Sequence, residues 1–208
     1  MIYEPEEMFY NSVRYNGCKS DDFSGGWQVI TLERLFTNVY GTGLYKGIFS
    51  IKDHEGRMKY LVRQVERVTG IRDFGIYMPK LLTLDAVFLN EDRHTHNISI
   101  LTDGNNNYRL CPIYDNGAAL LSDTVMDYPL TGDVYELISK VKAKTICEFF
   151  DEQLEIAEKL YGSRVTFSFT EKDAKQLLDS AAIYDKTIRN RVYDILLEQM
   201  RKYAAYFR

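Results

Sequence analysis

The chain has 208 residues, with 26 basic and 30 acidic side chains and a formal net charge of −4. This length favours a single domain that can bury a core without a disulfide or a metal. The mildly acidic charge argues against binding to nucleic acid or to an anionic membrane driven by bulk charge. The 3 cysteines are widely spaced, which excludes a disulfide framework and a zinc site built on thiolates.

No apolar run approaches the roughly 20 residues that a membrane-spanning helix needs. The first residues are acidic and lack the basic and apolar regions of a signal peptide. We therefore expect a cytoplasmic protein that contacts neither membranes nor nucleic acid directly.

The first 50 residues have the least regular pattern, with glycines at 25–26 and 41–43 that predict loops. Between these loops, residues 31–36 predict a short helix with Thr31 as its N-cap. From Asp53 to Val68, apolar residues recur at helical spacing, and Gly70 is expected to end that helix.

The next segment is apolar on nearly every side, which predicts a buried helix with Pro79 in its first turn and an end near Phe88. Strands are then predicted at 98–101 and 108–114, joined by a turn at 103–107. Beyond Gly132 the periodicity predicts helices near 133–160, 171–182 and 187–206.

The predicted fold class is therefore mainly α with a small β-hairpin (α+β), in one domain over residues 1–208. We expect an irregular lead-in over 1–50, a central region over 51–121 and a helical bundle over 130–208. The central region carries most of the polar residues that could support chemistry.

Asp92 and Asn97 lie in the loop before the first predicted strand, and Asp115 lies at the end of the second. The hairpin should bring these three residues together. Carboxylate and amide oxygens are hard ligands of the kind that hold Mg²⁺, which keeps its other positions for water and phosphates. The pair Asn97 and Asp115 is therefore typical of a magnesium–nucleotide site. It leaves Asp92, five residues before Asn97, to face an incoming hydroxyl.

This pattern resembles the catalytic and metal-binding loops of the HipA-like serine/threonine kinase family. The resemblance covers roughly residues 18–205 and is specific over 84–121. The phosphoinositide-kinase families share only the first part of the pattern and normally follow it with a different second motif. The matching residues are Leu84-Asp85, Asn90-x-Asp92-Arg93-His94-x-x-Asn97, Leu101 and Pro112-Ile113-Tyr114-Asp115-Asn116-Gly117.

The resemblance implies the C-terminal (large) lobe of a protein-kinase-like fold that transfers a phosphoryl group from ATP, with Mg²⁺, to a protein serine or threonine. In that role Asp92 is the catalytic base, and Asn97 and Asp115 bind Mg²⁺ and the nucleotide. Arg93 and His94 brace the catalytic loop.

Two further expectations concern neighbouring side chains. The resemblance gives Asp85 a structural role in the preceding helix. His94 and His96 are expected to be hydrogen-bonded loop residues, since a zinc site would need Cys partners or a third well-placed His.

A complete kinase also needs a β-rich N-lobe with a glycine-rich loop and a lysine that grips the phosphates. The only candidate, Gly41-Thr42-Gly43, lacks a third glycine and precedes a helix, so we interpret it as a loop. The N-lobe is therefore expected to be largely absent.

Three alternatives follow from a missing N-lobe. The chain is half of a split kinase or of a toxin–antitoxin type system, with a separate N-lobe or an antitoxin as its protein partner. It is a pseudokinase or a regulatory protein-binding module without catalysis. Or it is a minimal lobe that catalyses weakly alone. The presence of Asp92, Asn97 and Asp115 together favours the first and third alternatives.

Overall fold

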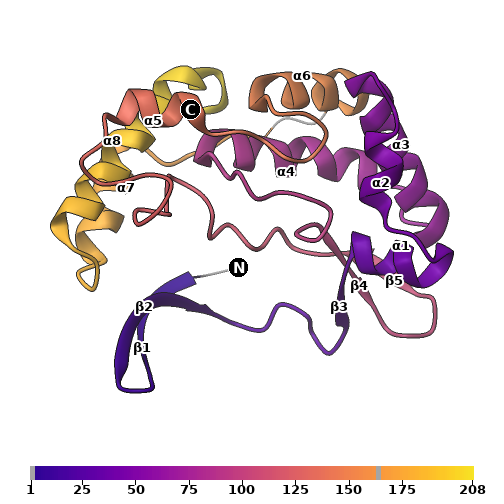
Figure 1. The fold of residues 1–208 in the computed structure, drawn as a ribbon, viewed down its shortest axis with the longest axis horizontal. Helices are drawn as coiled ribbons and strands as arrows, with labels where there is room; N and C mark the ends of the chain where they lie inside the picture. Colours follow the sequence, from indigo (N-terminus) through magenta and orange to yellow (C-terminus); the bar gives the residue numbers. More distant parts are fainter. Residues whose placement is uncertain (1–2, 163–164) are drawn as a thin grey trace.

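The computed structural model describes residues 3–162 and 165–208, and helices dominate it (Figure 1). Small antiparallel sheets accompany the helices, so the coarse prediction of a mainly α fold with little β structure is confirmed. The strands are β1 (Tyr3–Tyr10), β2 (Val13–Ser20), β3 (Gln28–Thr31), β4 (Ser99–Thr102) and β5 (Tyr108–Leu110). The helices are α1 (Leu32–Tyr40), α2 (Leu44–Phe49), α3 (His54–Thr69), α4 (Phe74–Phe88), α5 (Val134–Lys140), α6 (Phe150–Tyr161), α7 (Glu171–Ser180), α8 (Lys186–Lys202) and a short 3₁₀ turn at Ala204–Tyr206.

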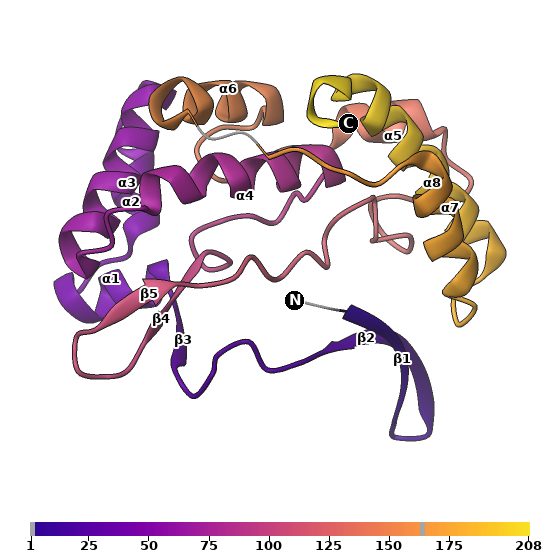
Figure 2. The same ribbon diagram turned by 180° about the vertical axis from the view of Figure 1, so that it is seen from behind.

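Helix α4 is the centre of the fold. It contacts α3, α6 and α8, and Figures 1 and 2 show it running through the middle of the helical body with α6 alongside. Most of its side chains are buried, as the apolar sequence predicts. A Cβ added at Gly75 would lie 2.7 Å from the Tyr161 ring of α6, so glycine permits the close approach of these two helices.

The two sheets occupy different places. Strands β3, β4 and β5 form an antiparallel sheet in the order β3-β4-β5, with Ile30 opposite Ile100 and Ile100 opposite Leu110. Strands β1 and β2 form a separate hairpin that lies apart from the helical body (Figure 2). Asn11 and Ser12 connect them with φ angles of 49° and 62°, as expected for a type I′ turn.

Several helix ends lie where the sequence predicts them. Thr31 caps α1, since its hydroxyl accepts from the Arg34 N–H at 3.2 Å. Helix α3 ends at Gly70, which has a φ of 72° that glycine adopts without strain. No helix within the described parts of the chain is long and apolar enough to cross a membrane.

The prediction of an irregular lead-in over residues 1–50 is wrong. This segment contains β1, β2, β3, α1 and α2. Almost every position of the hairpin strands is exposed, and β1 groups Met8, Phe9 and Tyr10 in one apolar run, so it lacks the apolar alternation by which strands are recognised. Strand β3 has only four residues and pairs with β4, about seventy positions later, which local pattern does not reveal.

The predicted position of Pro79 is also wrong. Helix α4 begins at Phe74, so Pro79 lies in its interior and not in its first turn. Proline removes one backbone hydrogen bond from a helix, and the buried packing of α4 on its neighbours compensates for that loss.

The predicted helix at 133–160 is in fact two helices, α5 and α6, separated by a non-helical loop over residues 141–149. A tertiary contact holds this segment, because the Thr145 hydroxyl donates to the Arg93 carbonyl at 2.7 Å. The second strand of the predicted hairpin ends at Leu110 and not near 114, since Pro112 has no N–H for a ladder. The last helix ends at Lys202, before the 3₁₀ turn.

Candidate active site

The loop between α4 and β4 carries Asp92 and is built from tight turns. Leu89 ends α4 with a φ of 53°, and the Asn90 N–H donates to the Asp85 carbonyl at 2.9 Å. The Asp92 carbonyl accepts from the His94 N–H at 3.0 Å, and the His94 carbonyl accepts from the Asn97 N–H at 2.8 Å. These bonds satisfy backbone groups in a partly buried loop and fix its path.

Arg93 holds the loop in place. Its side chain is 1 % exposed, and Nε donates to both carboxylate oxygens of Asp85 at 3.1 Å. Nη1 donates to the carbonyls of Asn97 and Tyr114 at 2.8 and 2.7 Å, and Nη2 donates to Asn116 Oδ1 at 2.6 Å. One guanidinium therefore joins helix α4, the loop that carries Asp92 and the segment after β5.

The Asp85 carboxyl is buried with this guanidinium. Burial raises the pKa of Asp85, and the charge of Arg93 and a hydrogen bond from Asn90 Nδ2 at 2.8 Å offset part of that rise. Removing one member of such a buried pair leaves the other charge uncompensated. The pair is inaccessible to solvent, so its role is to support the loop.

Asp92 and Asn97 are in direct contact. Asn97 Nδ2 donates to the Asp92 carbonyl at 2.9 Å and to Asp92 Oδ2 at 3.0 Å. The Asp92 side chain is 40 % exposed, and the His94 Nε2 lies 3.4 Å from its Oδ1. A positioned and accessible carboxylate of this kind can accept a proton from a hydroxyl.

Asp115 follows Tyr114, whose carbonyl accepts from the same Arg93 Nη1 that bonds to the Asn97 carbonyl, so the backbone of Asp115 lies near Asn97. Its backbone is left-handed, with a φ of 57°, and its side chain is exposed. The Arg93 bond to the Tyr114 carbonyl fixes the preceding peptide, which helps to hold a conformation that costs a non-glycine residue on the order of 1 kcal/mol. Within residues 3–162 and 165–208, the Asp115 carboxylate accepts no hydrogen bond.

The donor set fits Mg²⁺. With Nδ2 of Asn97 engaged by Asp92, its Oδ1 is left without a hydrogen-bond partner in the described chain. Arg93 Nη1 contacts both the Asn97 carbonyl and the carbonyl of the residue before Asp115, so the two residues are neighbours in space. An amide oxygen and a carboxylate oxygen are hard ligands. They suit Mg²⁺ better than a metal ion that prefers thiolate ligands.

The structure adds two residues that sequence reasoning missed, Lys144 and Thr145. Lys144 Nζ lies 3.7 Å from Asp92 Oδ1, and Thr145 is the buried residue that donates to the Arg93 carbonyl. They come from the loop between α5 and α6, about fifty positions after Asp92. Nothing in the local sequence marks that segment, because its path depends on the tertiary contact with Arg93.

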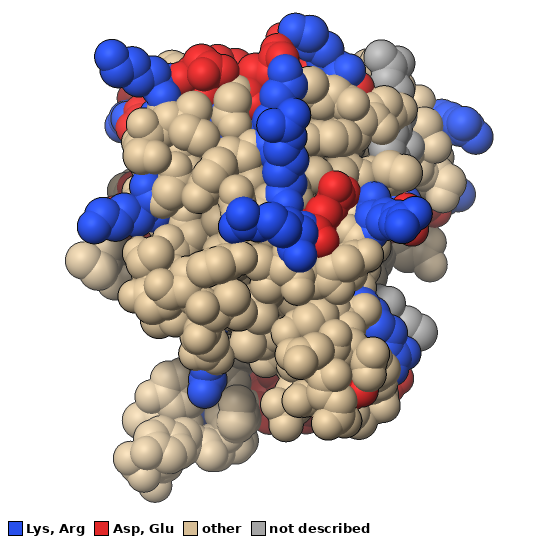
Figure 3. Space-filling model, turned by 90° about the vertical axis from the view of Figure 1, so that its right-hand side faces the viewer, with Lys and Arg blue, Asp and Glu red and all other residues tan. Residues whose placement is uncertain are grey.

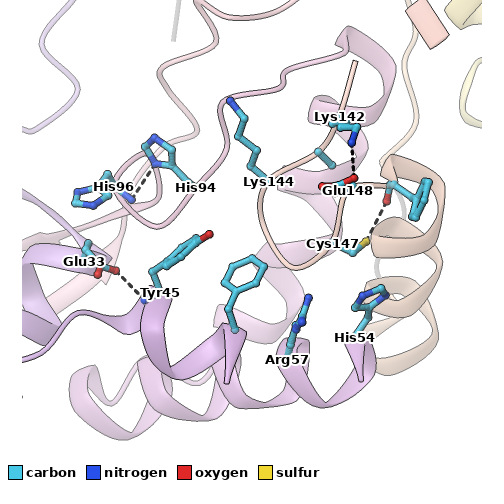
Figure 4. Close-up of a pocket in the computed structure, with 13 residues that line it drawn as sticks. Glu33, Tyr45, His54, Arg57, His94, His96, Lys142, Lys144, Cys147 and Glu148 are labelled. Atoms are coloured by element: carbon cyan, nitrogen blue, oxygen red, sulfur yellow. Dashed lines mark hydrogen bonds and ion pairs between the residues drawn. The ribbon is translucent and has the colours of Figure 1, made fainter. Parts of the chain in front are cut away.

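A cavity of about 780 Å³ opens beside Asp92. Figure 4 shows Tyr45 of α2 and Arg57 of α3 on one side, with His94 and Lys144 facing them across the space. His94 and Lys144 are the two residues whose side chains approach Asp92 Oδ1, so the carboxylate lies at the rim of this cavity.

Other histidines also border the cavity. The His96 N–H donates to His94 Nδ1 at 3.3 Å within the loop. On the opposite wall, donor atoms of His54, Cys147 and Glu152 lie within 4.8 Å of one another. Burial raises the pKa of the Cys147 thiol, which disfavours the thiolate that a metal requires.

The glycines at 41–43 have a structural use. Gly41 ends α1 with a φ of 71°, and a Cβ at Gly43 would lie 1.6 Å from Glu33 Oε1. The Glu33 carboxylate accepts from the Tyr45 N–H at 2.9 Å and from the Thr95 hydroxyl at 2.7 Å. A carboxylate therefore already occupies the start of α2, and the segment is a connection and not a phosphate cradle.

No protein-family model matches this chain, and no curated protein matches it significantly. A solved structure, that of the Helicobacter pylori proinflammatory kinase CtkA, is similar to it with a TM-score of 0.61 and 13 % sequence identity. The match covers 97 % of this chain and 74 % of the other. The chain therefore has a kinase-like fold.

Proposed function

We propose that this chain is the large lobe of a HipA-like serine/threonine kinase, which transfers the γ-phosphoryl group of ATP to a hydroxyl of a protein. The observation that carries the proposal is the arrangement around Arg93. The accessible Asp92 carboxylate contacts Asn97, and Arg93 Nη1 bonds to the carbonyls of Asn97 and Tyr114, which brings the backbone of Asp115 near this pair. The kinase-like fold supports the same assignment.

In this proposal each residue has one task. Asp92 orients the acceptor hydroxyl and takes its proton, and Asn97 Nδ2 holds the carboxylate in place. Asn97 Oδ1 and Asp115 hold Mg²⁺, which neutralises the phosphate charge of ATP when bound. The hydrogen bonds of the Arg93 guanidinium, which is itself held by Asp85, maintain the spacing of these groups. His94 remains a supporting residue of the loop beside Asp92.

A second candidate is a nucleotide-binding or protein-binding module without catalysis. Kinases grip the ATP phosphates with a lysine that pairs with a glutamate. In the described parts of this chain the Lys–Glu pairs are surface pairs, such as Lys59 with Glu55 and Lys142 with Glu148. This favours a protein partner, either a separate N-lobe or an antitoxin, as part of the functional assembly.

Thermal unfolding with and without Mg²⁺ and ATP tests the proposal. We expect Mg-ATP to raise the melting temperature, since a ligand at 100 times its Kd stabilises a protein by about 2.7 kcal/mol. Asp115→Ala should abolish this rise. Asp127→Ala, which removes an exposed carboxylate outside the site, should retain it. If Mg-ATP does not change the melting temperature of the wild-type protein, the proposal is contradicted.

The variant Asp92→Asn distinguishes the two candidate functions. This variant keeps the shape of the side chain and should retain the Mg-ATP shift while losing phosphoryl transfer to protein, measured with radiolabelled ATP. A wild-type protein that binds Mg-ATP but transfers no phosphoryl group, with any partner it co-purifies with, would favour the non-catalytic module.

A further inference from the structure

The cavity beside Asp92 offers a place for the acceptor. His94 and Lys144 line it, and both approach Asp92 Oδ1, at 3.4 and 3.7 Å. A hydroxyl that bonds to this oxygen is attached to a chain that must leave the site, and the cavity is the space into which it can continue. Its volume of about 780 Å³ is sufficient for several side chains of a peptide.

The charges around the cavity are unequally compensated. Its two carboxylates are already engaged, Glu33 by the Tyr45 N–H and Thr95, and Glu148 by Lys142 at 2.6 Å.

Two cations of the lining are less fully compensated. Arg57 donates Nε and Nη1 to the carbonyls of Ile51 and Ile146, both at 2.8 Å, and forms no ion pair with a described carboxylate. Among the described residues, Lys144 forms an ion pair with one carboxylate, that of Asp92, at the longer distance of 3.7 Å. Lys144 and Arg57 therefore give the cavity a positive character, although the whole chain carries −4.

The same end of the molecule carries several basic side chains on its outer surface. Figure 3 shows a central run of Lys and Arg side chains on this face, with Asp and Glu side chains beside it and near its upper edge. Helices α2 and α3 also supply Tyr45 and Arg57 to the cavity. A local positive field of this kind attracts acidic partners and raises their rate of association.

Aromatic rings complete the lining. The Tyr45 and Phe49 rings lie 4.4 Å apart, the Arg57 guanidinium lies 4.7 Å from the Phe49 ring centre, and Phe149 is 63 % exposed. Such rings give apolar contact area beside the cations. This combination suits a peptide with carboxylates and apolar groups better than a small inorganic anion.

We propose that this cavity binds the acceptor polypeptide and selects an acidic segment next to the hydroxyl that is phosphorylated. Lys144 and Arg57 pair with carboxylates of that segment, and Lys144 holds the end nearest to Asp92. This inference rests on the proposed kinase function and names the substrate class of the same site.

Fluorescence anisotropy with labelled serine peptides tests the inference without requiring catalysis. Three peptides of equal length carry Glu, Gln or Lys beside the serine. We expect the Glu peptide to bind about tenfold more tightly than the Gln peptide, which corresponds to about 1.4 kcal/mol, and the Lys peptide to bind most weakly. The preference should weaken as salt is raised. Equal binding of the three peptides overturns the inference.

Charge reversal sharpens this test. Lys144 is exposed, so Lys144→Glu should fold normally, and it should reverse the preference in favour of the Lys peptide. Lys80→Glu, on the exposed side of α4 and outside the cavity, should leave the preference unchanged. A preference for the Glu peptide that survives Lys144→Glu overturns the inference.

Two further measurements separate this inference from the proposed function. If Mg-ATP raises the melting temperature but no peptide preference exists, the inference alone fails. If the Glu peptide binds selectively but Mg-ATP does not bind, the proposed function alone fails. If ATP displaces the Glu peptide and Lys144→Glu weakens both equally, the cavity is a nucleotide phosphate site and the inference is overturned.

Discussion

The loop that carries Asp92, between α4 and β4, and the N-terminal hairpin are held in opposite ways. The loop is fixed by a buried cation, Arg93, which bonds to groups from three separate parts of the chain. The hairpin is held mainly by its own ladder, from Tyr3 opposite Ser20 to Tyr10 opposite Val13, and most of its residues are exposed.

Few contacts connect the hairpin to the helical body. Asn16 Nδ2 donates to the Ile183 carbonyl at 2.8 Å, and the Tyr184 hydroxyl donates to the Gly17 carbonyl at 3.0 Å. A two-stranded hairpin is marginally stable alone, so we expect it to open more readily than the loop that carries Asp92. The difference indicates that the rigidity of this fold is concentrated where the proposed chemistry occurs.

The largest expected effect comes from breaking the buried pair. Asp85→Ala leaves the Arg93 guanidinium buried without its carboxylate and should lower the free energy of unfolding by about 3–5 kcal/mol, measured by urea denaturation. The matched change in the hairpin is Glu7→Ala, which removes the half-buried partner of Arg14. It should change the free energy by at most about 0.5 kcal/mol. Similar losses in the two variants would contradict the contrast between the regions.

A pair of glycine substitutions gives an intermediate effect. In Gly75→Ala the new methyl group meets the Tyr161 ring at 2.7 Å, so the α4–α6 contact must shift. We expect a loss of about 1–3 kcal/mol in thermal or urea unfolding. In Gly17→Ala nothing lies within 4 Å of the new Cβ, and stability should be nearly unchanged. A Gly17→Ala protein that is as unstable as Gly75→Ala would show that the hairpin is packed more tightly than its exposure indicates.

The contrast between locally and distantly determined structure also explains which features could be predicted from the sequence. The apolar periodicity located α3 and α4, and the order of polar residues located Asp92, Asn97 and Asp115 around one hairpin. These features depend on local spacing. The exposed β1–β2 hairpin and the third strand of the sheet were missed because their signal lies in turn geometry and in a pairing partner far along the chain.

The candidate site was incomplete for the same physical reason. Lys144 reaches Asp92 only because helix α5 ends at Lys140 and Thr145 bonds to the Arg93 carbonyl. Helical periodicity over 133–160 predicted a continuous helix, and the tertiary hydrogen bond outweighs that local preference. A sequence pattern alone contains no record of such a contact.

The smallest effect concerns the thiols. Burial raises the pKa of Cys111 to about 11, and its side chain lies in the sheet region with 1 % exposure, whereas Cys18 is exposed on the hairpin. The thiolate is the species that reacts with alkylating reagents. At pH 8 we therefore expect a reagent such as iodoacetamide to label Cys18 readily and Cys111 hardly at all, with peptide mass spectrometry identifying the labelled sites.

The contribution of Cys111 to stability changes with pH in one direction. The native state holds the Cys111 proton more tightly than the unfolded chain, whose thiol has an ordinary pKa near 9.0, so the native state binds more protons between pH 9 and 11. The stability that this group contributes is fully present below pH 9 and is lost as the pH rises towards 11. Cys111→Ala should reduce this alkaline loss, whereas Cys18→Ala should not. Rapid labelling of Cys111 at pH 8 in the folded protein would show that the sheet opens as easily as the hairpin.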